Sequence, residues 1–449
     1  MAKAKKSKLT IEDALVPVEE QPYEIPQNWC WVKINSVANV YTGNSINERV
    51  KADKYEGQLK GILFIATKDV DFDNSINYET NVRITDPDNY KKAPANTALL
   101  CIEGGSAGKK IGFTNQEVCF GNKLCAFASD KIEPKYIYYF LQSNAFIYQF
   151  NDKKHGLIGG VSVKDLCDIG ITLPPLAEQK RIVEQIESLF AKLDEAKELV
   201  SDSIQKSSLR LKSLINSVFT GELLNIRDVH TVPLVDLVNE IKIGPFGSSL
   251  HKEDYIENGI PVINPKHINK QTIVPATNVT IPKKKAEELS AYVLKSNDII
   301  MGRRGEMGRT APVSIKEEGY ICGTGSLIIR LKDSYRADFY SQILASQEIV
   351  SYLDENCVGS TMSNLNEKIV KKIPVPYFTP QQQEELMLRL NMLLSEENQI
   401  MEKLDGIVDA ISMMKKSILA KAFRGELGTN NPDEESAVEL LRSILEQEE

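Results

Sequence analysis

The sequence predicts an α/β protein made of two tandem domains, each followed by one long helix, and the two helices are expected to pack on each other. Two observations predict this fold class. The chain resembles itself at an interval of about 200 residues, and in each repeat a strand-rich first part gives way to a helical second part. The length of 449 residues also exceeds what one hydrophobic core usually supports.

Four pairs of similar segments carry the repeat, and they occur in the same order. SLINSVFTGEL at 213–223 resembles SILAKAFRGEL at 417–427, at an offset of 204. Three earlier pairs have offsets of 198, 200 and 203: GILFIATKDV at 61 with GIPVINPKHI at 259, LLCIEGGSAGK at 99 with IIMGRRGEMGR at 299, and YIYYFLQS at 136 with FYSQILAS at 339. The pair at 99 and 299 matches Gly105 with Gly305, Gly108 with Gly308 and Lys109 with Arg309. A common order and a slowly drifting offset indicate a duplicated unit.

The first part of each repeat is typical of strands. Short β-rich runs such as GILFIATKDV and SNDIIMG are broken by Gly, Asn, Asp and Pro, with a few helical turns such as KYIYYFLQS between them. This pattern predicts β-rich α/β domains at residues 1–172 and 225–373.

The second part of each repeat predicts one long helix, at 173–224 and at 374–427. Apolar residues recur mostly at alternating steps of four and three, which is the spacing of a coiled-coil seam. The predicted seam contains Ile182, Ile186, Leu189, Leu193, Ala196, Val200, Ile204, Leu211, Leu214 and Val218 in the first helix, and Leu386, Leu390, Leu393, Ile400, Leu404, Ile407, Ile411, Met414 and Ile418 in the second. Glu397 is the polar residue in the second seam.

The helix ends carry capping signals. The run TPQQ at 379–382 supplies an N-cap, a proline at the first helical position and the glutamine of a capping box, and Pro174-Pro175 serves the first helix less completely. Gly221 and Gly425 stand where a left-handed C-cap is expected. Each helix should therefore hold about 40 residues and span about 60 Å.

The net charge of −8 is concentrated in the tail at 428–449, where seven acidic residues stand against Arg442 alone. The remaining chain is near neutral, so its charge does not exclude DNA as a partner. Within the tail, apolar residues recur at helical spacing and predict a short docked helix: Ala437, Leu440, Leu441, Ile444 and Leu445.

Cysteine and histidine usage argues against a disulfide framework and a metal centre. The seven cysteines are an odd number without a C-x-x-C pair, and the four histidines never stand at H-x-x-x-H spacing. The cysteines are predicted to be reduced and mostly buried. No run of about 18 apolar residues and no secretory leader is seen, so we expect a cytoplasmic protein.

Four stretches resemble one known family: IPQNWCWVKINSVANV at 25–40, LPPLAEQKRIVEQIESLFAKLD at 173–194, IKIGPFGSSL at 241–250, and SILAKAFRGEL at 417–427. Together with the order of β-rich units and long helices, they resemble the specificity subunit of type I restriction-modification systems. The resemblance covers nearly the whole chain. One departure is VPYFTPQQQEEL at 375–386, where the family has P-P-x-x-E-Q, so the first turn of the second helix is expected to sit differently.

The resemblance implies two tandem α/β target-recognition domains joined by two long antiparallel coiled-coil helices, with a pseudo-twofold internal repeat. It implies a subunit without catalysis or a cofactor of its own, in which each target-recognition domain reads one half of a bipartite double-stranded DNA site through the major groove. The helices would set the spacer between the half-sites and bind two modification subunits, which methylate adenine with S-adenosylmethionine. Restriction subunits that use ATP with Mg²⁺ would join this core.

The candidate DNA contacts lie on loops, where donors can reach base edges and phosphates. Glycine loops are the first candidates, because glycine lets the backbone approach a phosphate and nearby cations supply charge. The loop residues are Gly105, Ser106, Gly108, Lys109 and Lys110 in the first repeat, and Arg303, Arg304, Gly305, Gly308 and Arg309 in the second. Lys68 and Lys266 after matched strands, and Ser248 and Ser249 in GPFGSSL, complete the set. Each also has a structural alternative: an ordinary β-turn, a solvated strand-end lysine or a helix-capping turn.

Catalytic motifs are poorly matched, so no catalytic residue is predicted. The loop at 104–110 is one residue short of a P-loop and lacks its Ser or Thr. The N/D-P-P-Y/F/W tetrapeptide of an amino-methyltransferase is missing, which disfavours an orphan methyltransferase. A PD…ExK nuclease drawn from Pro87-Asp88 and Glu133-Pro134-Lys135 fails because Pro134 would interrupt the required strand. The remaining alternative to DNA recognition is a scaffold that holds two protein partners.

Overall fold

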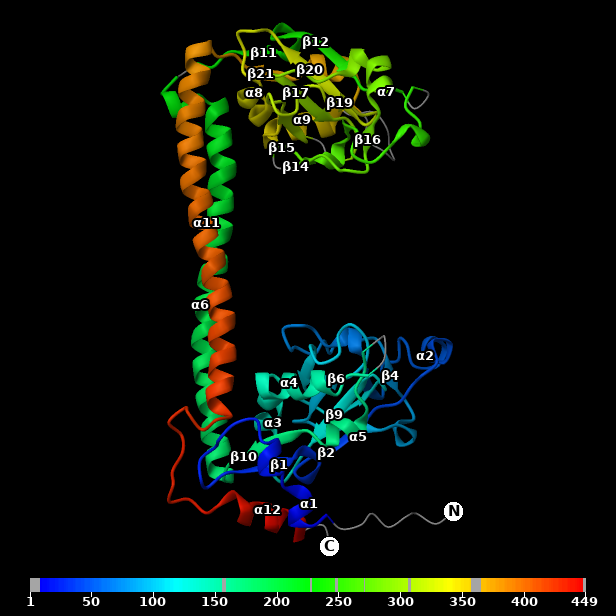
Figure 1. Ribbon diagram of the computed structural model, residues 1–449, viewed down its shortest axis with the longest axis vertical. Coiled ribbons are helices and arrows are strands. Elements are labelled where there is room, and N and C mark those ends of the chain that lie inside the picture. Colours follow the sequence, from blue (N-terminus) through cyan, green and yellow to red (C-terminus); the bar gives the residue numbers. More distant parts are fainter. Residues whose placement is uncertain are drawn as a thin grey trace. The chain divides into compact units, whose positions relative to one another are not determined.

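The computed structural model describes residues 9–155, 159–226, 228–246, 249–269, 271–305, 308–356 and 365–446. These residues form two compact units: unit 1 holds the chain up to Leu199 and from Ile407 onward, and unit 2 holds Val200–Gly406. Each unit contains one α/β domain and parts of two long helices, α6 (Leu176–Phe219, 44 residues) and α11 (Pro380–Ala422, 43 residues), which Figure 1 labels. The predicted fold class, two tandem α/β domains with two long helices, is confirmed.

The domain of unit 1 is built on two four-stranded sheets. The first has the order β2 (Asn39–Thr42), β9 (Leu124–Ala128), β6 (Ala98–Cys101), β7 (Ile111–Phe113). The second has the order β4 (Arg83–Ile84), β3 (Ile62–Ile65), β8 (Val118–Phe120), β5 (Lys92–Ala93), and β3 and β8 run parallel. Alternating apolar residues of both sheets, among them Ile65, Leu99 and Phe120, are fully or almost fully buried in one shared cluster. The sheets therefore form a common core.

Helices and one further strand pair complete this domain. β1 (Cys30–Lys33) pairs antiparallel with β10 (Gly170–Leu173), which leads directly into α6. The helices are α1 (Ile11–Ala14), α2 (Glu48–Lys54), α3 (Pro134–Leu141), α4 (Asn144–Asp152) and α5 (Val163–Cys167). Helix α3 begins with proline at its first position, where no backbone donor is needed, and it packs on β6 (Figure 1).

The domain of unit 2 repeats this topology. Its four-stranded sheet has the order β12 (Val238–Ile243), β20 (Ser326–Leu331), β17 (Asp298–Gly302), β18 (Thr310–Pro312). β13 (Ile260–Ile263) lies between β16 (Thr280–Ile281) and β19 (Ile321–Cys322), parallel to the latter, as β3 is to β8. The pairs β11 (Thr231–Pro233) with β21 (Pro374–Pro376) and β14 (Ile268–Asn269) with β15 (Thr272–Ile273) complete the strands. The helices are α7 (Lys283–Glu288), α8 (Ala337–Leu344), α9 (Gln347–Asn356) and α10 (Glu367–Lys371).

The duplication extends to single side chains at the start of each long helix. Gln179 of α6 and Gln383 of α11 are both fully buried. Each donates to the carbonyl oxygen five residues before it, at 2.9 and 2.8 Å. Each also accepts from the backbone amide of the residue that caps α3 or α8, at 3.0 Å in both domains. The sequence departure at 375–386 therefore leaves this glutamine in the same role, contrary to the expected difference in the first turn.

The predicted helix ends are confirmed. The Thr379 amide donates to Gln382 Oε1 at 2.9 Å and the Gln382 amide donates to Thr379 Oγ1 at 3.3 Å, which is a reciprocal capping box. Gly221 and Gly425 have φ values of +71° and +75°, the left-handed conformation that glycine adopts without a Cβ clash.

Within each unit the two helices run antiparallel. In unit 1, Lys415 of α11 pairs with Asp194 of α6 at 2.5 Å, and its ammonium lies 4.9 Å from the Phe190 ring centroid. In unit 2, Glu397 of α11 accepts from Ser207 and pairs with Arg210 of α6. Ile182, Ile186, Val218, Leu386, Leu390 and Ile411 are buried, and Leu189, Leu193, Leu211, Leu214, Leu393, Leu404 and Ile418 are half-buried. Ile182 and Ile186 belong to the core of unit 1, and Val218, Leu386 and Leu390 to the core of unit 2.

Three predicted seam residues are wrong: Met414, which is 53% exposed, Ile400 and Ile407. Ile407 is 45% exposed, and its neighbour Val408 is half-buried instead. The same one-residue shift holds at Met401, which is half-buried where Ile400 is 40% exposed. Glu397, Leu404 and Ile411 keep their predicted inward positions, and the inward positions between them are Met401 and Val408, one residue after the predicted ones.

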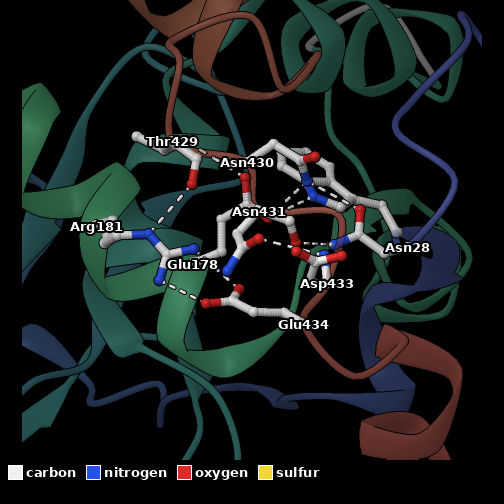
Figure 2. A network of polar contacts seen from close by, with 9 residues as sticks. Asn28, Glu178, Arg181, Thr429, Asn430, Asn431, Asp433 and Glu434 are labelled. Carbon is white, nitrogen blue, oxygen red and sulfur yellow. Dashed lines mark hydrogen bonds and ion pairs between the residues drawn. The ribbon is translucent and has the colours of Figure 1, made fainter.

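The tail forms the predicted short helix, α12 (Ala437–Glu446), and this helix is part of the core of unit 1. Ala437, Leu441, Ile444 and Leu445 are buried there, and α12 packs against α1 and the turn at Ile34–Ser36. The segment before α12 is tied down by the polar network of Figure 2.

Two carboxylates organise that network. Glu178 is fully buried and accepts from Trp29 Nε1 at 2.8 Å and Asn430 Nδ2 at 3.0 Å; its burial raises the pKa of the carboxyl above the ordinary value. Glu434 accepts two bonds from the Arg181 guanidinium, at 2.7 and 2.9 Å, and these bonds lower the pKa of Glu434. The residues preceding α12 are therefore fastened to the first turns of α6.

Six cysteines lie among the described residues; Cys167 is half-buried and the other five are buried, as predicted. Cys357 lies outside the described residues. In the described part of the chain no group of three or more His, Cys, Asp or Glu side chains is arranged to hold a metal ion. None of the described helices combines the length and apolarity that a membrane span requires.

Candidate nucleic-acid interface

The first candidate site is the loop at 102–109, which joins β6 to β7. Gly104 and Gly108 have φ values of +80° and +75°. The Gly108 amide donates to Cys101 O at 2.9 Å, and a Cβ at this position would lie 2.7 Å from the Phe150 ring of α4. Gly108 is therefore required both by its backbone conformation and by the close approach of α4.

The equivalent loop of the second domain, at 303–308, joins β17 to β18, and residues 306–307 lie outside the described chain. Gly305 and Gly308 have φ values of +83° and +77°. A Cβ on Gly308 would lie 2.4 Å from Val350 of α9, the counterpart of α4. In both domains a glycine near the end of the loop thus lies close against the helix α4 or α9.

The strand ladders correct the predicted matching of the two loops. The Cys101 amide donates to Lys110 O at 2.9 Å, and the Gly302 amide donates to Arg309 O at 2.8 Å, so Arg309 corresponds to Lys110 and not to Lys109. Counted from the last residues of β6 and β17, Cys101 and Gly302, Gly305 corresponds to Gly104 and not to Gly105. The first loop is longer than the second, which an ungapped comparison of the sequences cannot show.

The two corresponding cations make the same contact. Lys110 Nζ donates to the carbonyl oxygen of Thr67 at 3.3 Å, and Arg309 Nη1 donates to that of Pro265 at 3.4 Å. Thr67 and Pro265 each open the short turn that follows β3 or β13.

These turns carry Lys68 and Lys266, and both side chains are exposed. The structure therefore brings Lys68 close to Lys110, and Lys266 close to Arg309, although the two residues of each pair are far apart in the sequence.

The other candidates differ in accessibility. Gly105, Lys109 and Arg304 are exposed, and Ser106 is half-buried. Arg303 is only 9% exposed, and burial lowers the pKa of its guanidinium. Its side chain therefore belongs to the base of the loop, which argues against the direct DNA contact that the sequence suggested.

The serines of GPFGSSL are less informative. Ser249 is exposed and its amide donates to Phe246 O at 2.9 Å, which is a turn contact. Ser248 lies outside the described residues.

One accessible residue near the first loop escaped the sequence-based prediction. Phe72 stands at a hairpin tip after the Lys68 turn and is 65% exposed, and Lys110 Nζ lies 4.8 Å from its ring centroid. The signal available in the sequence was an aromatic residue inside a turn-forming run, DFDNS at 71–75.

The arrangement has no counterpart of a catalytic centre in the residues named so far. Each domain offers glycine backbone and an exposed lysine, and the first domain adds an exposed aromatic ring. Such groups suit phosphates and base edges, which need donors and apolar contacts rather than acid–base pairs.

Comparisons with known proteins identify the family. Residues 26–201 and 228–416 each match the family described as "Type I restriction modification DNA specificity domain". The chain is 24% identical over 452 residues to the type I restriction enzyme EcoBI specificity subunit of Escherichia coli, covering 94% of this chain and 92% of the relative. It is 25% identical over 362 residues to the StySPI specificity subunit of Salmonella potsdam, covering 76% of this chain and 77% of the relative.

Solved structures agree in fold. A chain described under "Structural basis underlying complex assembly and conformational transition of the type I R-M system" superposes with a TM-score of 0.71 at 18% identity, covering 90% of this chain and all of the other. The HsdS subunit from Thermoanaerobacter tengcongensis gives a TM-score of 0.55 at 18% identity, covering 91% of this chain and all of the other. With both halves matched by the same family, the chain belongs to the type I restriction-modification specificity subunits, the DNA-recognition and non-catalytic components of these systems, as its sequence had indicated.

Proposed function

We propose that each α/β domain reads one half of a bipartite double-stranded DNA site through the major groove. The observation that carries this proposal is the duplicated contact of Lys110 with Thr67 and of Arg309 with Pro265. In each domain this contact joins the glycine loop to the turn that follows β3 or β13, and that turn carries an exposed lysine, Lys68 or Lys266. Two equivalent cationic edges on one chain suit two half-sites.

In this proposal the loop edges supply two kinds of contact. Lys68, Lys109 and Lys266 are exposed cations that would neutralise phosphates, and the backbone at Gly104 and Gly305 lies in open space where a phosphate could approach. Phosphate contacts of this kind position the protein on DNA, and sequence is read by other side chains in the groove.

The proposal assigns the paired helices α6 and α11 two tasks: setting the spacer between the half-sites and binding two modification subunits. Restriction subunits would join that complex. S-adenosylmethionine, and ATP with Mg²⁺, are assigned to those partner subunits and not to this chain.

Binding measurements on the chain assembled with its neighbouring modification subunit test the proposal. Lys68→Ala should weaken binding to all sequences about equally and reduce the dependence of log Kd on log salt by about one unit, because one phosphate contact is lost. Lys164→Ala on α5 removes the same charge from an exposed site in the same domain and should leave both unchanged.

Methylation mapping and a domain exchange test the division of labour. Single-molecule sequencing of methylated adenine should show a split motif with a fixed gap only when the modification subunit is present. Replacing residues 225–373 with the segment of another family member should change one half of that motif. A motif changed in both halves, or binding without salt dependence or sequence preference, would support the protein-scaffold alternative instead.

A further inference from the structure

The hairpin tip at 71–75 is a rigid projection beside the first candidate loop. Val70 and Ile76 form a β-bridge below it, and the Asp71 amide donates to Ser75 O at 3.0 Å. Asn74 adopts a left-handed φ of +70°, and its Nδ2 donates to Gln142 Oε1 at 3.0 Å. The tip is therefore fixed at its base and at its turn.

Phe72 projects from this tip with 65% of its surface exposed. Burying an aromatic side chain is favourable, so a ring held outward on an ordered turn is a surface ready for a partner. Its exposed position is supported by Lys110, whose Nζ lies 4.8 Å from the ring centroid and 3.3 Å from Thr67 O.

The charges around Phe72 indicate which part of DNA the tip would meet. Asp71 and Asp73 flank the ring and would be repelled by phosphates, whereas Lys68 and Lys110 stand beside the tip and would be attracted to them. An acidic and aromatic tip with lysines nearby suits the floor of the major groove, where apolar groups meet the thymine methyl and carboxylates accept from cytosine N4.

The second domain carries different chemistry at the corresponding hairpin. Gln271 lies between β14 and β15 and its Nε2 donates to Thr310 Oγ1 at 3.4 Å. Gln271 has a left-handed φ of +62°, as Asn74 has at the turn of the first hairpin, so it corresponds to Asn74 and not to Phe72. In the sequence Lys270 stands in the place of Phe72, and it lies outside the described residues. The supporting cation contact is kept in both domains. A constant support with a variable tip is what two domains that read different bases require.

We propose that Phe72 is a specificity-determining residue of the first domain, which contacts the 5-methyl group of a thymine in the major groove. This inference rests on the proposed DNA-reading function and names one residue that carries it out. It makes Lys110 a positioning residue for the ring.

The test compares Phe72→Ala with Leu59→Ala in the complex assembled with the modification subunit. Leu59 is 94% exposed in the same domain, so both changes remove an exposed apolar side chain. Phe72→Ala should lower the affinity for the cognate site about 10- to 100-fold and leave the affinity for unrelated DNA unchanged, since a lost base contact has effects of this order. Leu59→Ala should change neither, and an unchanged thermal midpoint for both variants shows that the fold is intact.

Deoxyuridine substitution identifies the contact itself. Replacing each thymine of the half-site in turn removes only the methyl group. One such replacement should weaken binding of the unmodified chain and have no further effect on Phe72→Ala. The inference is overturned if no deoxyuridine replacement weakens binding of the unmodified chain, or if the losses of affinity from the replacement and from Phe72→Ala are additive. It is also overturned if the ratio of affinities for cognate and unrelated DNA stays within about twofold in Phe72→Ala. An unmodified chain that shows no sequence preference at all would instead refute the proposed function.

Discussion

Replacing Leu441 with alanine should weaken unit 1 and leave unit 2 unaffected. Leu441 is fully buried and belongs to the same core cluster as Ala14, Val32 and Ile171 of the N-terminal domain. Alanine is an excellent helix former, so α12 itself would not be harmed, and the loss would come from packing alone.

The size of the effect follows from cavity formation. Truncating a buried leucine to alanine costs about 2–5 kcal/mol in the free energy of unfolding. For a unit of this size each 1 kcal/mol corresponds to about 2–4 °C in Tm, so the transition of unit 1 should fall by roughly 5–20 °C. The matched control is Ser443→Ala on the same helix, because Ser443 is exposed and bonds only within α12, to Leu440 O at 2.7 Å.

Hydrogen–deuterium exchange measured by mass spectrometry would locate the loss. Exchange should speed up in the strands at 30–33 and 170–173 of unit 1, and stay unchanged in the equivalent strands at 231–233 and 374–376 of unit 2. Equal acceleration in both units, or a Leu441→Ala effect no larger than that of Ser443→Ala, would refute the claim that the tail belongs to the core of unit 1.

Two further predictions concern the tail and the helix pair. Glu434 has a pKa held below its ordinary value of 4.5 by Arg181, so its stabilising effect is complete above pH 4.5 and is lost as the pH falls through the lower, folded-state pKa. The difference in free energy of unfolding between the unmodified chain and Glu434→Gln, about 0.5–1 kcal/mol for a partly exposed pair, should therefore be constant from pH 7 to 5.5 and shrink towards pH 3; a difference that grows in acid would contradict the pairing. In α11, Ile411→Ser should destabilise the helix pair by about 2–4 kcal/mol because Ile411 is 5% exposed, whereas Ile407→Ser should cost less than about 0.5 kcal/mol in urea unfolding, and equal costs would restore the seam predicted from the sequence.

The sequence predicted the fold well where local rules decide the structure. Glycine has few substitutes in a left-handed C-cap, so Gly221 and Gly425 marked the helix ends correctly. The internal repeat predicted that the two domains share one topology, and the strand orders of their sheets agree with this. The helical spacing of apolar residues in the tail predicted α12 because a buried face has to recur at the helical period.

Prediction from sequence was weaker where contacts between distant segments decide the structure. Val408 takes the place of Ile407 in the seam, a choice that periodicity cannot make because apolar residues occupy both adjacent positions. The matching of the glycine loops was wrong by one residue because only the strand ladder reveals their different lengths. Phe72 was overlooked because its exposure, and not its residue type, makes it notable.

The docked tail makes the N-terminal domain a structure that spans the whole chain. Its first strand lies near residue 30 and its last core helix ends at Glu446. On the ribosome, the first domain would therefore emerge early but remain incomplete, with an apolar surface exposed, until α12 has been translated. Unit 2 consists of one continuous stretch of the chain, Val200–Gly406, so the second domain can complete its fold first. A protein quality-control system would thus detect a prematurely terminated chain by a defect at its opposite end.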